Sequence, residues 1–397
     1  LALWLCGAAL FIRGIDRDKN ALVYAAALPI TAPCFYAYQA FAMIPLLSFY
    51  ALKRRRITAR ELLVLSVPLL LMAGWQLSGY MHRGISYASA MVAYIDAHGV
   101  LRGTTKVSTA IAVLTYLGGT ILPFPFIFWR MARRWKGALA WIGLAAGVMT
   151  AYQRLGSYAW LEKTFFVGCF AGGVAAALWV LARGLKSWSR EHWTADDLFF
   201  CLWFTGILAA SVAAFFSGSA RYLLPACPPL LLLLIRADEQ RHVLLNRTSL
   251  FYSTLLIVQV TLGLFLAQSD YEFAGTGRRQ AQEFQADYQK GQKPFLFSGE
   301  WGFRYYLTAM GGEIMAQDTT GSPGELVVKS RLCLAQSFDN DLDRSLQLVE
   351  RRNYRIGSPV RLLDQKSHAG FWSDGWGVLP FGFSRETLDE FSIYRVR

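Results

Sequence analysis

The residue pair Arg221-Tyr222 has the strongest potential for chemistry in this sequence. Arg221 is the only charge in the long apolar stretch Leu198–Ile235. A guanidinium group is planar and carries five hydrogen-bond donors, so it can bind a phosphate through two parallel hydrogen bonds. The alternative is an interfacial anchor, because arginine and tyrosine both favour the boundary between an apolar and a polar phase. The pair is therefore a candidate binding site for a lipid-linked phosphate.

A second candidate is the loop at residues 81–106, which is rich in side chains that titrate or form hydrogen bonds. Its candidate residues are His82, Arg83, Asp96, His98 and Arg102. Asp96 and His98 have side chains suited to general acid–base chemistry or to a divalent metal ion. An isolated Asp-x-His pair is a weak signal, and the favoured interpretation is a solvated helix lying in a membrane interface.

A third candidate is the turn that contains Tyr36, Tyr38 and Gln39. Prolines on both sides of this turn interrupt any continuous helix. Broken helices at membrane depth are tolerated where they line a cavity, so these side chains are candidates for a substrate cavity. Aromatic packing at a membrane interface explains them equally well.

The aromatic, glycine-rich stretch Gly370–Phe383 has two interpretations. Its rings could stack on a sugar or lie on a membrane, but a loop packed into a core is favoured. The sequence contains no phosphate-binding loop, no dinucleotide-binding glycine motif and no HExxH metal motif. The six cysteines show no metal-ligand spacing. No cofactor is therefore predicted, and a divalent metal ion is kept as an alternative.

The composition indicates a membrane protein. Of the 397 residues, 54% are hydrophobic and 17% are charged, whereas soluble domains are about 25% charged. This excludes a disordered protein, a coiled coil and a small disulfide scaffold. Residues 1–267 carry 24 Lys+Arg and 10 Asp+Glu, whereas residues 268–397 carry 16 and 17. The basic excess lies in the apolar part, which is typical of membrane topology and not of nucleic-acid binding.

Charge-free stretches of about 20 residues predict the membrane spans. Single crossings are expected at Leu62–Met81, Val107–Trp129, Gly137–Gln153, Thr164–Ala182 and Thr248–Ser269, with the end of another span at Leu1–Phe11. Ala21–Leu52 and Leu198–Ile235 are too long for one crossing of a hydrocarbon core of about 30 Å. Each is therefore predicted to be a hairpin of two short helices, the first turning near Phe35–Gln39 and the second at Phe216–Arg221.

The distribution of Lys and Arg predicts the orientation of these spans. One set of loops carries 18 of these residues and the opposite set carries 6. The positive-inside rule places the first set in the cytoplasm. Arg221 and the C-terminal tail then lie outside the cytoplasm, and we expect a multi-pass protein of a bacterial inner membrane.

The expected fold has two parts. Residues 1–269 form a polytopic α-helical membrane domain of about ten helices. Residues 270–397 form a soluble α/β domain, with strands expected at Pro294–Ser298, Glu325–Lys329, Gln347–Val349 and Phe391–Val396 and a short helix at Gly299–Met310. Because an α/β layer needs a shared hydrophobic core, this tail is predicted to fold as a domain of its own.

Four stretches of the sequence resemble a family of membrane proteins. They are YQAFAMIPLLSFYAL before the basic KRRR loop, GSARYLLPACPPLLLLL before the last span, and the tail stretches FSGEWGFRYYL and FWSDGWGVLPFGF. These stretches are similar to the C-type-fold membrane glycosyltransferases. The nearest resemblance is to bacterial relatives of the dolichyl-phosphate-mannose protein mannosyltransferase and of the lipid A aminoarabinose transferase.

The resemblance implies roles for particular residues. Arg221-Tyr222 is similar to the family's Arg-Tyr at the outer end of a late span, which implies a contact with the carrier phosphate. Tyr38 and Gln39 stand where the family often has a lysine. The resemblance therefore implies no role for the turn of the hairpin Ala21–Leu52. The family's catalytic aspartate lies between its first two spans and has no counterpart here, which implies that an upstream part with an odd number of spans is missing.

The function that the resemblance implies is transfer of a sugar from a polyprenyl-phosphate carrier. The acceptor would be a glycan, a lipid or a protein outside the cytoplasm. A transporter or flippase of lipid-linked sugars is the alternative, because broken helices with midplane sites are also typical of transporters. A non-catalytic envelope scaffold is a third interpretation. The large tail and the lack of internal repeats favour the transferase.

Overall fold

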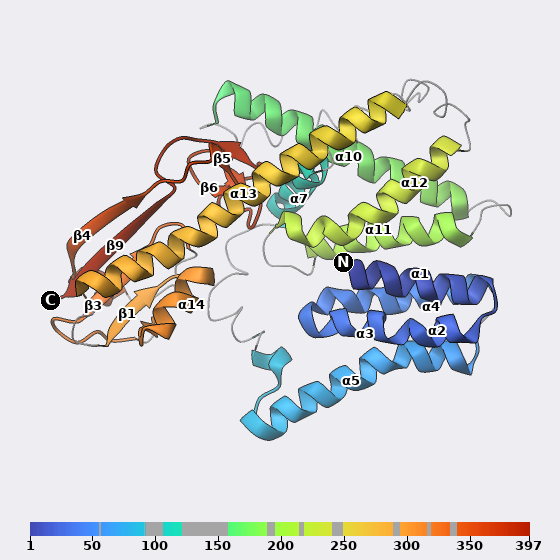
Figure 1. The fold of residues 1–397 in the computed structure, drawn as a ribbon, viewed down its shortest axis with the longest axis horizontal. Helices are drawn as coiled ribbons and strands as arrows, with labels where there is room; N and C mark the ends of the chain where they lie inside the picture. The colour runs from blue at the N-terminus through green and yellow to red at the C-terminus, as the bar shows by residue number, and fades with distance from the viewer. Residues whose placement is uncertain are drawn as a thin grey trace.

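The computed structural model describes residues 1–54, 57–90, 92, 106–120, 158–188, 195–213, 218–239, 249–288, 294–315, 319–333 and 340–397. Within these ranges the protein consists of an apolar helical part and a C-terminal tail domain built on a β-sheet (Figure 1). One long helix, α13, runs from the first part into the second.

The first group of helices forms an antiparallel layer, in which α2 and α3 together form one arm that runs opposite to α1 and α4 (Figure 1). In chain order it contains α1 (Ala2–Asp16), α2 (Asn20–Ala25), α3 (Ala27–Tyr36), the 3-10 helix η1 (Tyr38–Ala42), α4 (Met43–Lys53) and α5 (Ala59–Arg83). The start of α5 is fixed by a capping box, in which Thr58 and Glu61 satisfy each other's main-chain groups.

Both predicted hairpins are present. Helix α3 ends at Tyr36 because Ala37 takes an extended conformation, with φ −152° and ψ 111°. The second break follows α11, where Ser219 is also extended, with φ −144° and ψ 136°. Both turns lie on the side of the helices that faces the tail domain (Figure 1). Phe216 and Ser217, predicted as part of the second turn, lie outside the described residues.

The second group of helices packs beside the first. It contains α7 (Lys106–Thr120), α10 (Trp160–Trp188), α11 (Ala195–Ala213), the 3-10 helix η2 (Ala220–Ala226), α12 (Cys227–Glu239) and α13 (Ser249–Tyr288). Helices α7 and α10 approach closely through Gly118 and Gly173. A Cβ atom on either glycine would lie 1.8 Å from a carbonyl oxygen of the facing helix, so only glycine fits at these two positions.

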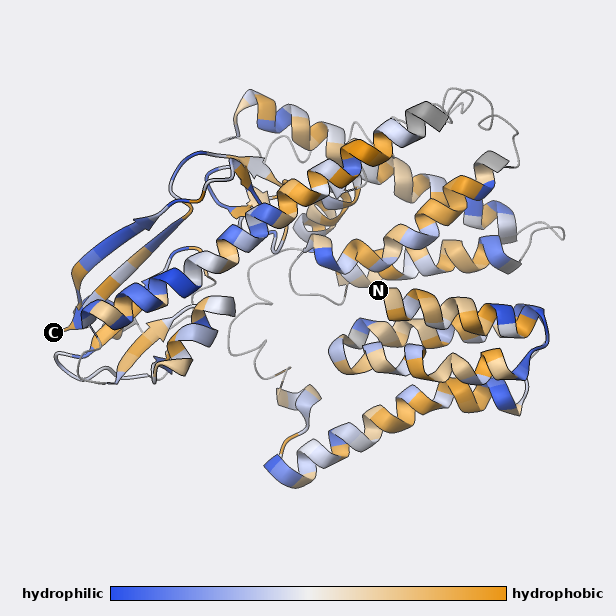
Figure 2. Cartoon of the chain, in the orientation of Figure 1, coloured by the Kyte–Doolittle hydropathy of each residue, from blue (hydrophilic) through white to orange (hydrophobic). Residues whose placement is uncertain are grey.

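Five helices among the described residues are long and apolar enough to cross a membrane: Ala59–Arg83, Trp160–Ser187, Asp196–Ala213, Ala220–Ala237 and Ser253–Tyr288. Hydrophobic residues predominate along these helices up to the first half of α13, whereas hydrophilic ones gather at helix ends, along the second half of α13 and in the tail (Figure 2). The expected span Val107–Trp129 is described only as far as Thr120, and Gly137–Gln153 lies outside the described residues. A total of about ten helices therefore stays a prediction.

A continuous hydrophobic core joins the two helix groups. The rings of Trp4 and Trp203 meet at 5.8 Å, and those of Tyr50 and Phe199 meet at 5.4 Å in an edge-to-face arrangement. Aromatic pairs at these separations add to the stability that burial provides. Residues of α1 to α5, α7, α10, α11, η2 and α12 therefore share one hydrophobic core within the described residues, whereas the apolar half of α13 is largely exposed.

The tail domain is a mixed sheet with helices packed against it. Its elements are β1 (Phe295–Ser298), α14 (Trp301–Ala309), β2 (Glu313–Ile314), β3 (Leu326–Ser330), α15 (Asn340–Ser345), β4 (Leu346–Tyr354) and β9 (Asp389–Val396), with short pairs from β5 (Val360–Arg361), β6 (Leu363–Asp364), β7 (Ala369–Gly370) and β8 (Gly382–Phe383). The main sheet has the order β2-β1-β3-β9-β4, parallel across its first three strands and antiparallel beyond them. The four predicted strands and the predicted helix are all present, within two residues of the expected starts of those elements.

Helix α13 is 40 residues long and passes through the predicted domain boundary between Ser269 and Asp270. Its second half packs on the tail sheet, where Ala281 and Phe284 belong to the same buried cluster as Phe297 of β1. The tail domain therefore includes part of the helix that also belongs to the apolar part.

Candidate functional site

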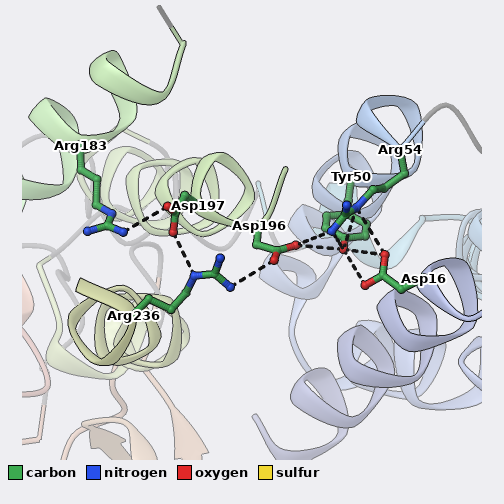
Figure 3. Close-up of polar contacts among 7 residues, drawn as sticks. All are labelled: Asp16, Tyr50, Arg54, Arg183, Asp196, Asp197 and Arg236. Carbon is green, nitrogen blue, oxygen red and sulfur yellow. Dashed lines mark hydrogen bonds and ion pairs between the residues drawn. The ribbon is translucent and has the colours of Figure 1, made fainter. Parts of the chain in front are cut away.

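The two ends of the helices carry contrasting arrangements of charge. At the end far from the tail domain, Asp196 accepts hydrogen bonds from Arg54 at 3.0 Å and Arg236 at 3.1 Å (Figure 3). The Tyr50 hydroxyl lies 3.0 Å from the same carboxylate. The same hydroxyl lies 3.0 Å from Asp16 of α1. These contacts tie α11 and α12 to α1 and α4.

The neighbouring Asp197 is more deeply buried, with 3% of its side chain exposed. It accepts one hydrogen bond from Arg183 of α10 and one from Arg236 of α12, both at 3.1 Å (Figure 3). Each oxygen of this carboxylate therefore has an arginine donor, and such charge-assisted hydrogen bonds offset part of the cost of burying the group. This ion-pair network was not predicted from the sequence, although Asp196-Asp197 are adjacent acids at the start of a span in a basic chain.

Arg221 lies at the opposite end of the helices, at the start of η2. Its guanidinium donates a hydrogen bond of 2.9 Å to the Tyr222 hydroxyl and lies 4.9 Å from the centre of the Tyr222 ring. It also lies 5.8 Å from the ring of Trp372 in the tail domain. The residue is exposed, and within the described ranges no carboxylate forms an ion pair with it. The guanidinium therefore contacts two aromatic rings while the residue as a whole remains exposed.

The turn that carries Arg221 is joined to a loop of the tail domain by its main chain. The Ala220 N–H donates to the Phe371 carbonyl at 2.8 Å, and the Asp374 N–H donates to the Gly218 carbonyl at 2.9 Å. The Ser219 hydroxyl adds a third bond to the Phe371 carbonyl, at 3.2 Å. We call the two paired segments, residues 218–221 and 371–374, the docking seam.

The Trp372 side chain is held in place by helix α13. Its indole N–H donates a hydrogen bond of 2.9 Å to Asp270 of α13. The indole therefore has a fixed orientation when its ring meets the Arg221 guanidinium. A residue from each of three regions, η2, α13 and the tail loop, is needed to build this contact.

Asp374 ends the docking seam with a buried carboxylate. The Gly218 main chain and the Thr109 side chain of α7 hydrogen-bond to it and favour its charged form, and the nearby Lys106 favours that form as well. Burial nevertheless raises the pKa of Asp374 above its ordinary value of 3.8. The groups that bond to this carboxylate are neutral, whereas Asp197 at the other end of the helices is held by two arginines.

Further contacts fix the tail domain on the helices. The Tyr116 hydroxyl of α7 donates to the Gly377 carbonyl at 2.7 Å. The ring of His368 stacks on Tyr158 with centres 3.6 Å apart, and its Nε2 lies 3.8 Å from Glu162. The stretch Gly370–Phe383 thus docks the tail, and Trp376, Leu379 and Phe381 within it are buried as a core-packing loop requires.

The structure separates the other predicted site residues from Arg221. Tyr36 is 90% exposed at the hairpin tip, Tyr38 and Gln39 lie in η1, and His82 and Arg83 end α5 with exposed side chains. No hydrogen bond, ion pair or ring contact joins Tyr36, Gln39, His82 or Arg83 to Arg221 within the described part of the chain. Asp96, His98 and Arg102 lie outside the described residues.

Sequence reasoning identified Arg221 but missed its supports. Asp270, Trp372 and Asp374 come from a different part of the chain, and only the aromatic character of Gly370–Phe383 indicated them. Asp374 is the one charge in that stretch, which is the signal that was overlooked. In the part of the chain that the structure describes, no three His, Cys, Asp or Glu side chains converge as metal ligands.

Comparison of the chain with protein-family models, with curated proteins and with solved structures found no match. The role of each residue in this site therefore rests on its contacts and on its position in the fold.

Proposed function

We propose that this protein transfers a sugar from a polyprenyl-phosphate donor to an acceptor on the non-cytoplasmic face of a bacterial inner membrane. Arg221 binds the carrier phosphate in this reaction, and Tyr222 orients its guanidinium. The tail domain lies on the same side of the membrane as the phosphate.

One observation carries the proposal: Arg221 is an exposed guanidinium that is fixed between two aromatic rings but has no acidic partner among the described residues. An arginine that serves only as a membrane anchor needs neither the ring of Trp372 nor the docking seam around it. An exposed cation that is held by two rings, at the end of a membrane helix, is suited to an anionic lipid headgroup.

The chemistry of the leaving group gives Arg221 a catalytic role. As the glycosyl bond breaks, the carrier phosphate gains negative charge. A cation that is already in place stabilises that charge more strongly in the transition state than in the bound donor, and this difference raises the rate.

The test is sugar transfer by the whole protein in membranes, with Arg221 substituted. Arg221→Ala should lose about 2–4 kcal/mol of transition-state stabilisation, which is about 30- to 1000-fold in rate. Arg221→Lys should keep part of the activity, because it retains the charge but loses the planar fork.

Arg279→Ala is the matched control. Arg279 is also exposed, and it lies 4.9 Å from the ring of Tyr354, the same separation as between Arg221 and Tyr222. It stands in the tail domain away from the docking seam, so its loss should leave transfer unchanged. Near-normal turnover in Arg221→Ala would reduce Arg221 to a membrane anchor and remove the support for the transferase.

A second candidate function, transport of a lipid-linked sugar, is favoured by the ion-pair network in Figure 3. That network joins the two helix groups at one end, and transporters open and close such ends during their cycle. The two functions differ in their product. A transferase forms a new glycosidic bond with donor and acceptor on one side of sealed vesicles, whereas a transporter moves the labelled donor across the bilayer unchanged.

A further inference from the structure

Helix α13 provides a scale on which the level of each segment packed against it can be read. Asp270 is the first charged residue of this helix, which begins at Ser249. The hydrocarbon part of a span along α13 therefore ends close to Ser269. Leu264 and Tyr271 are both exposed and lie on the same face of the helix, about 10 Å apart along its axis. Leu264 then lies at the level of the acyl chains, and Tyr271 lies at the interface with water, where tyrosine is enriched.

Two hydrogen bonds fix the level of strand β5 on this scale. The Ser358 N–H donates to the Glu272 carboxylate at 3.0 Å, and the Ser269 hydroxyl donates to the Val360 carbonyl at 2.6 Å. As the chain advances from Ser358 to Val360, it therefore moves back along α13 from Glu272 to the end of the span. Strand β5 thus lies beside α13 and runs toward the bilayer (Figure 1).

The tip of the β5–β8 pair lies beside the final turns of the span. Leu362, which follows β5, and Phe381, which precedes β8, belong to one buried cluster, and Leu262 and Leu266 of α13 pack against that cluster. These two leucines of α13 lie about 5 to 10 Å inward from Ser269 along the helix. Part of the tail domain therefore reaches the level of the acyl chains.

Phe383 is the exposed aromatic residue of this pair. In the antiparallel register of β5 and β8 it stands opposite Val360, whose carbonyl accepts the hydrogen bond from Ser269. Phe383 thus lies at the level where the span ends, with 68% of the residue exposed. Arg385, which follows shortly along the chain, is also exposed. An aromatic ring followed by a cation at this level is typical of a protein surface in contact with lipid headgroups.

We propose that the β5–β8 pair is a membrane anchor of the tail domain, inserted into the lipid interface on the tail side of the bilayer. The Phe383 ring lies among the upper acyl chains, and the Arg385 guanidinium binds lipid phosphates, which its planar donors suit. The docking stretch Gly370–Phe383 ends at this anchor, so contact with lipid holds that stretch against the helices. This inference requires that α13 crosses a bilayer, and it does not depend on the proposed function.

Lipid is favoured over a protein partner because this surface continues the exposed surface of α13. Only 6% of the apolar window of α13 is buried within the described protein, and a bilayer is the medium that covers such a helix. Phe383 lies beside the end of that window, so the same lipid reaches its ring. A second copy of the chain would have to displace this lipid before it could contact Phe383.

The experiment places one fluorophore at a time on the whole protein in liposomes of phosphatidylethanolamine and phosphatidylglycerol. The labelled variants are Phe383→Cys and Arg385→Cys in a Cys6→Ala background, because the other cysteines are buried or half-buried. Nitroxide lipids quench a fluorophore that touches them, and iodide quenches one in water. Phe383→Cys should be quenched most strongly by a nitroxide on the upper acyl chain, and Arg385→Cys by one on the headgroup. Both fluorophores should be shielded from iodide.

Val349→Cys is the matched control, because Val349 is also an exposed apolar residue of a tail strand. The next residue, Glu350, accepts a hydrogen bond of 2.7 Å from Tyr288, the last residue of α13. Tyr288 lies about 28 Å beyond Ser269 along the helix. A fluorophore at Val349 should therefore be quenched by iodide several-fold more strongly than one at Phe383, and by neither lipid.

Arg385→Cys also tests the anchor with the Phe383 ring in place. Adding Phe383→Ser to this variant should weaken quenching by the headgroup nitroxide and increase quenching by iodide. Because Phe383 is exposed, the melting temperature in detergent should not change, and a fall in that temperature would assign the ring a role in folding instead.

The other outcomes overturn the proposal in distinguishable ways. Quenching by iodide at Phe383 as strong as at Val349 would show that the ring lies in water. Protection from both iodide and the nitroxide lipids would show that a protein surface covers it. If a fluorophore at Leu264→Cys escapes the acyl-chain nitroxide, α13 does not cross the bilayer and the premise fails. None of these results depends on sugar transfer, so the proposed function is tested separately.

Discussion

The two ends of the helical bundle handle their charges in opposite ways. At the end far from the tail, the arginines and aspartates among the 7 residues of Figure 3 contact one another, and Asp197 receives a donor on each oxygen. At the tail end, Arg221 has no acidic partner among the described residues, and the buried Asp374 carboxylate is held by the neutral Thr109 side chain and the main chain instead of by two arginines. The first arrangement resembles a structural clamp, and the second resembles a site built to bind a polar ligand.

This difference indicates where substitutions should affect stability and where they should affect function. A saturated network loses stability when one member is removed, because its partners are left buried and charged. An exposed cation without an acidic partner adds no ion-pair energy, so its retention needs another reason. The predictions below test this division, from the largest expected effect to the smallest.

The largest effect expected is in the accessibility of the two ends from outside the cell. In a Cys6→Ala background, Ser322→Cys in the tail should react with an impermeant thiol reagent in spheroplasts with an intact inner membrane. Lys19→Cys, at the far end of the helices, should react only after permeabilisation, because the basic loops are expected in the cytoplasm. The reverse pattern would contradict the proposed orientation and place Arg221 on the wrong face for the proposed reaction.

Removal of Asp197 should have the largest effect on stability. Asp197→Ala leaves the charges of Arg183 and Arg236 without their shared acceptor, and we expect a loss of about 3 kcal/mol in the free energy of unfolding. Unfolding in detergent–SDS mixtures measures this change. Asp343→Ala is the control, because Asp343 pairs with Lys329 on the surface with 61% of its side chain exposed, where a loss of at most about 1 kcal/mol is expected.

A smaller loss is expected from Tyr50→Phe. The substitution keeps the ring that packs on Phe199 and removes only the hydroxyl between Asp16 and Asp196. Because Arg54 still contacts both carboxylates, the loss should be about 1 kcal/mol. A loss as large as that of Asp197→Ala would mean that the network depends on the hydroxyl more than on its ion pairs.

The smallest effect concerns pH and separates Asp374 from the saturated acids. Its pKa in the folded protein is raised by burial, so the folded state binds a proton more tightly than the unfolded state. The stability that this provides is fully present below the ordinary pKa of 3.8 and is lost as the pH rises through the raised value.

Asp374→Asn should remove this dependence. Its unfolding temperature should match or exceed that of wild type at neutral pH, and the difference should become smaller on acidification. Melting curves of both proteins, recorded from acidic to neutral pH, provide the measurement. A variant that is less stable than wild type at neutral pH would show that the hydrogen bonds to the carboxylate outweigh the cost of its burial.

The local features of the fold were predictable because their causes lie close together in the sequence. The prolines around Phe35–Gln39 gave the first hairpin, and the glycine and serines before Arg221 gave the second. Short apolar runs between polar segments indicated the tail strands. The end of α13 was not predicted at Tyr288, because hydropathy alone marks Asp270 as the end of a span. The helix continues there as an amphipathic one that buries Phe284 in the tail.

The contacts that build the site were beyond prediction, because they join distant parts of the chain. Arg54 meets Asp196 across 142 positions, and Ser219 meets Phe371 across 152. Arg221 could be singled out because one charge between apolar stretches is conspicuous by itself. Trp372 and Asp374 acquire meaning only when the tail is docked, so composition could give no more than an aromatic loop.

Helix α13 has a geometric consequence for this docking, because it passes without a break from the apolar part into the tail. Each residue added to a helix moves the rest of the chain along the axis by about 1.5 Å and rotates it by about 100°. An insertion beside Gly263, whose surroundings are open, would therefore swing Trp372 around the helix axis and away from Arg221. Two full turns, about seven residues, would restore the direction but displace the tail by about 11 Å. The number of residues in α13 thus decides whether Trp372 of the tail faces Arg221 of η2.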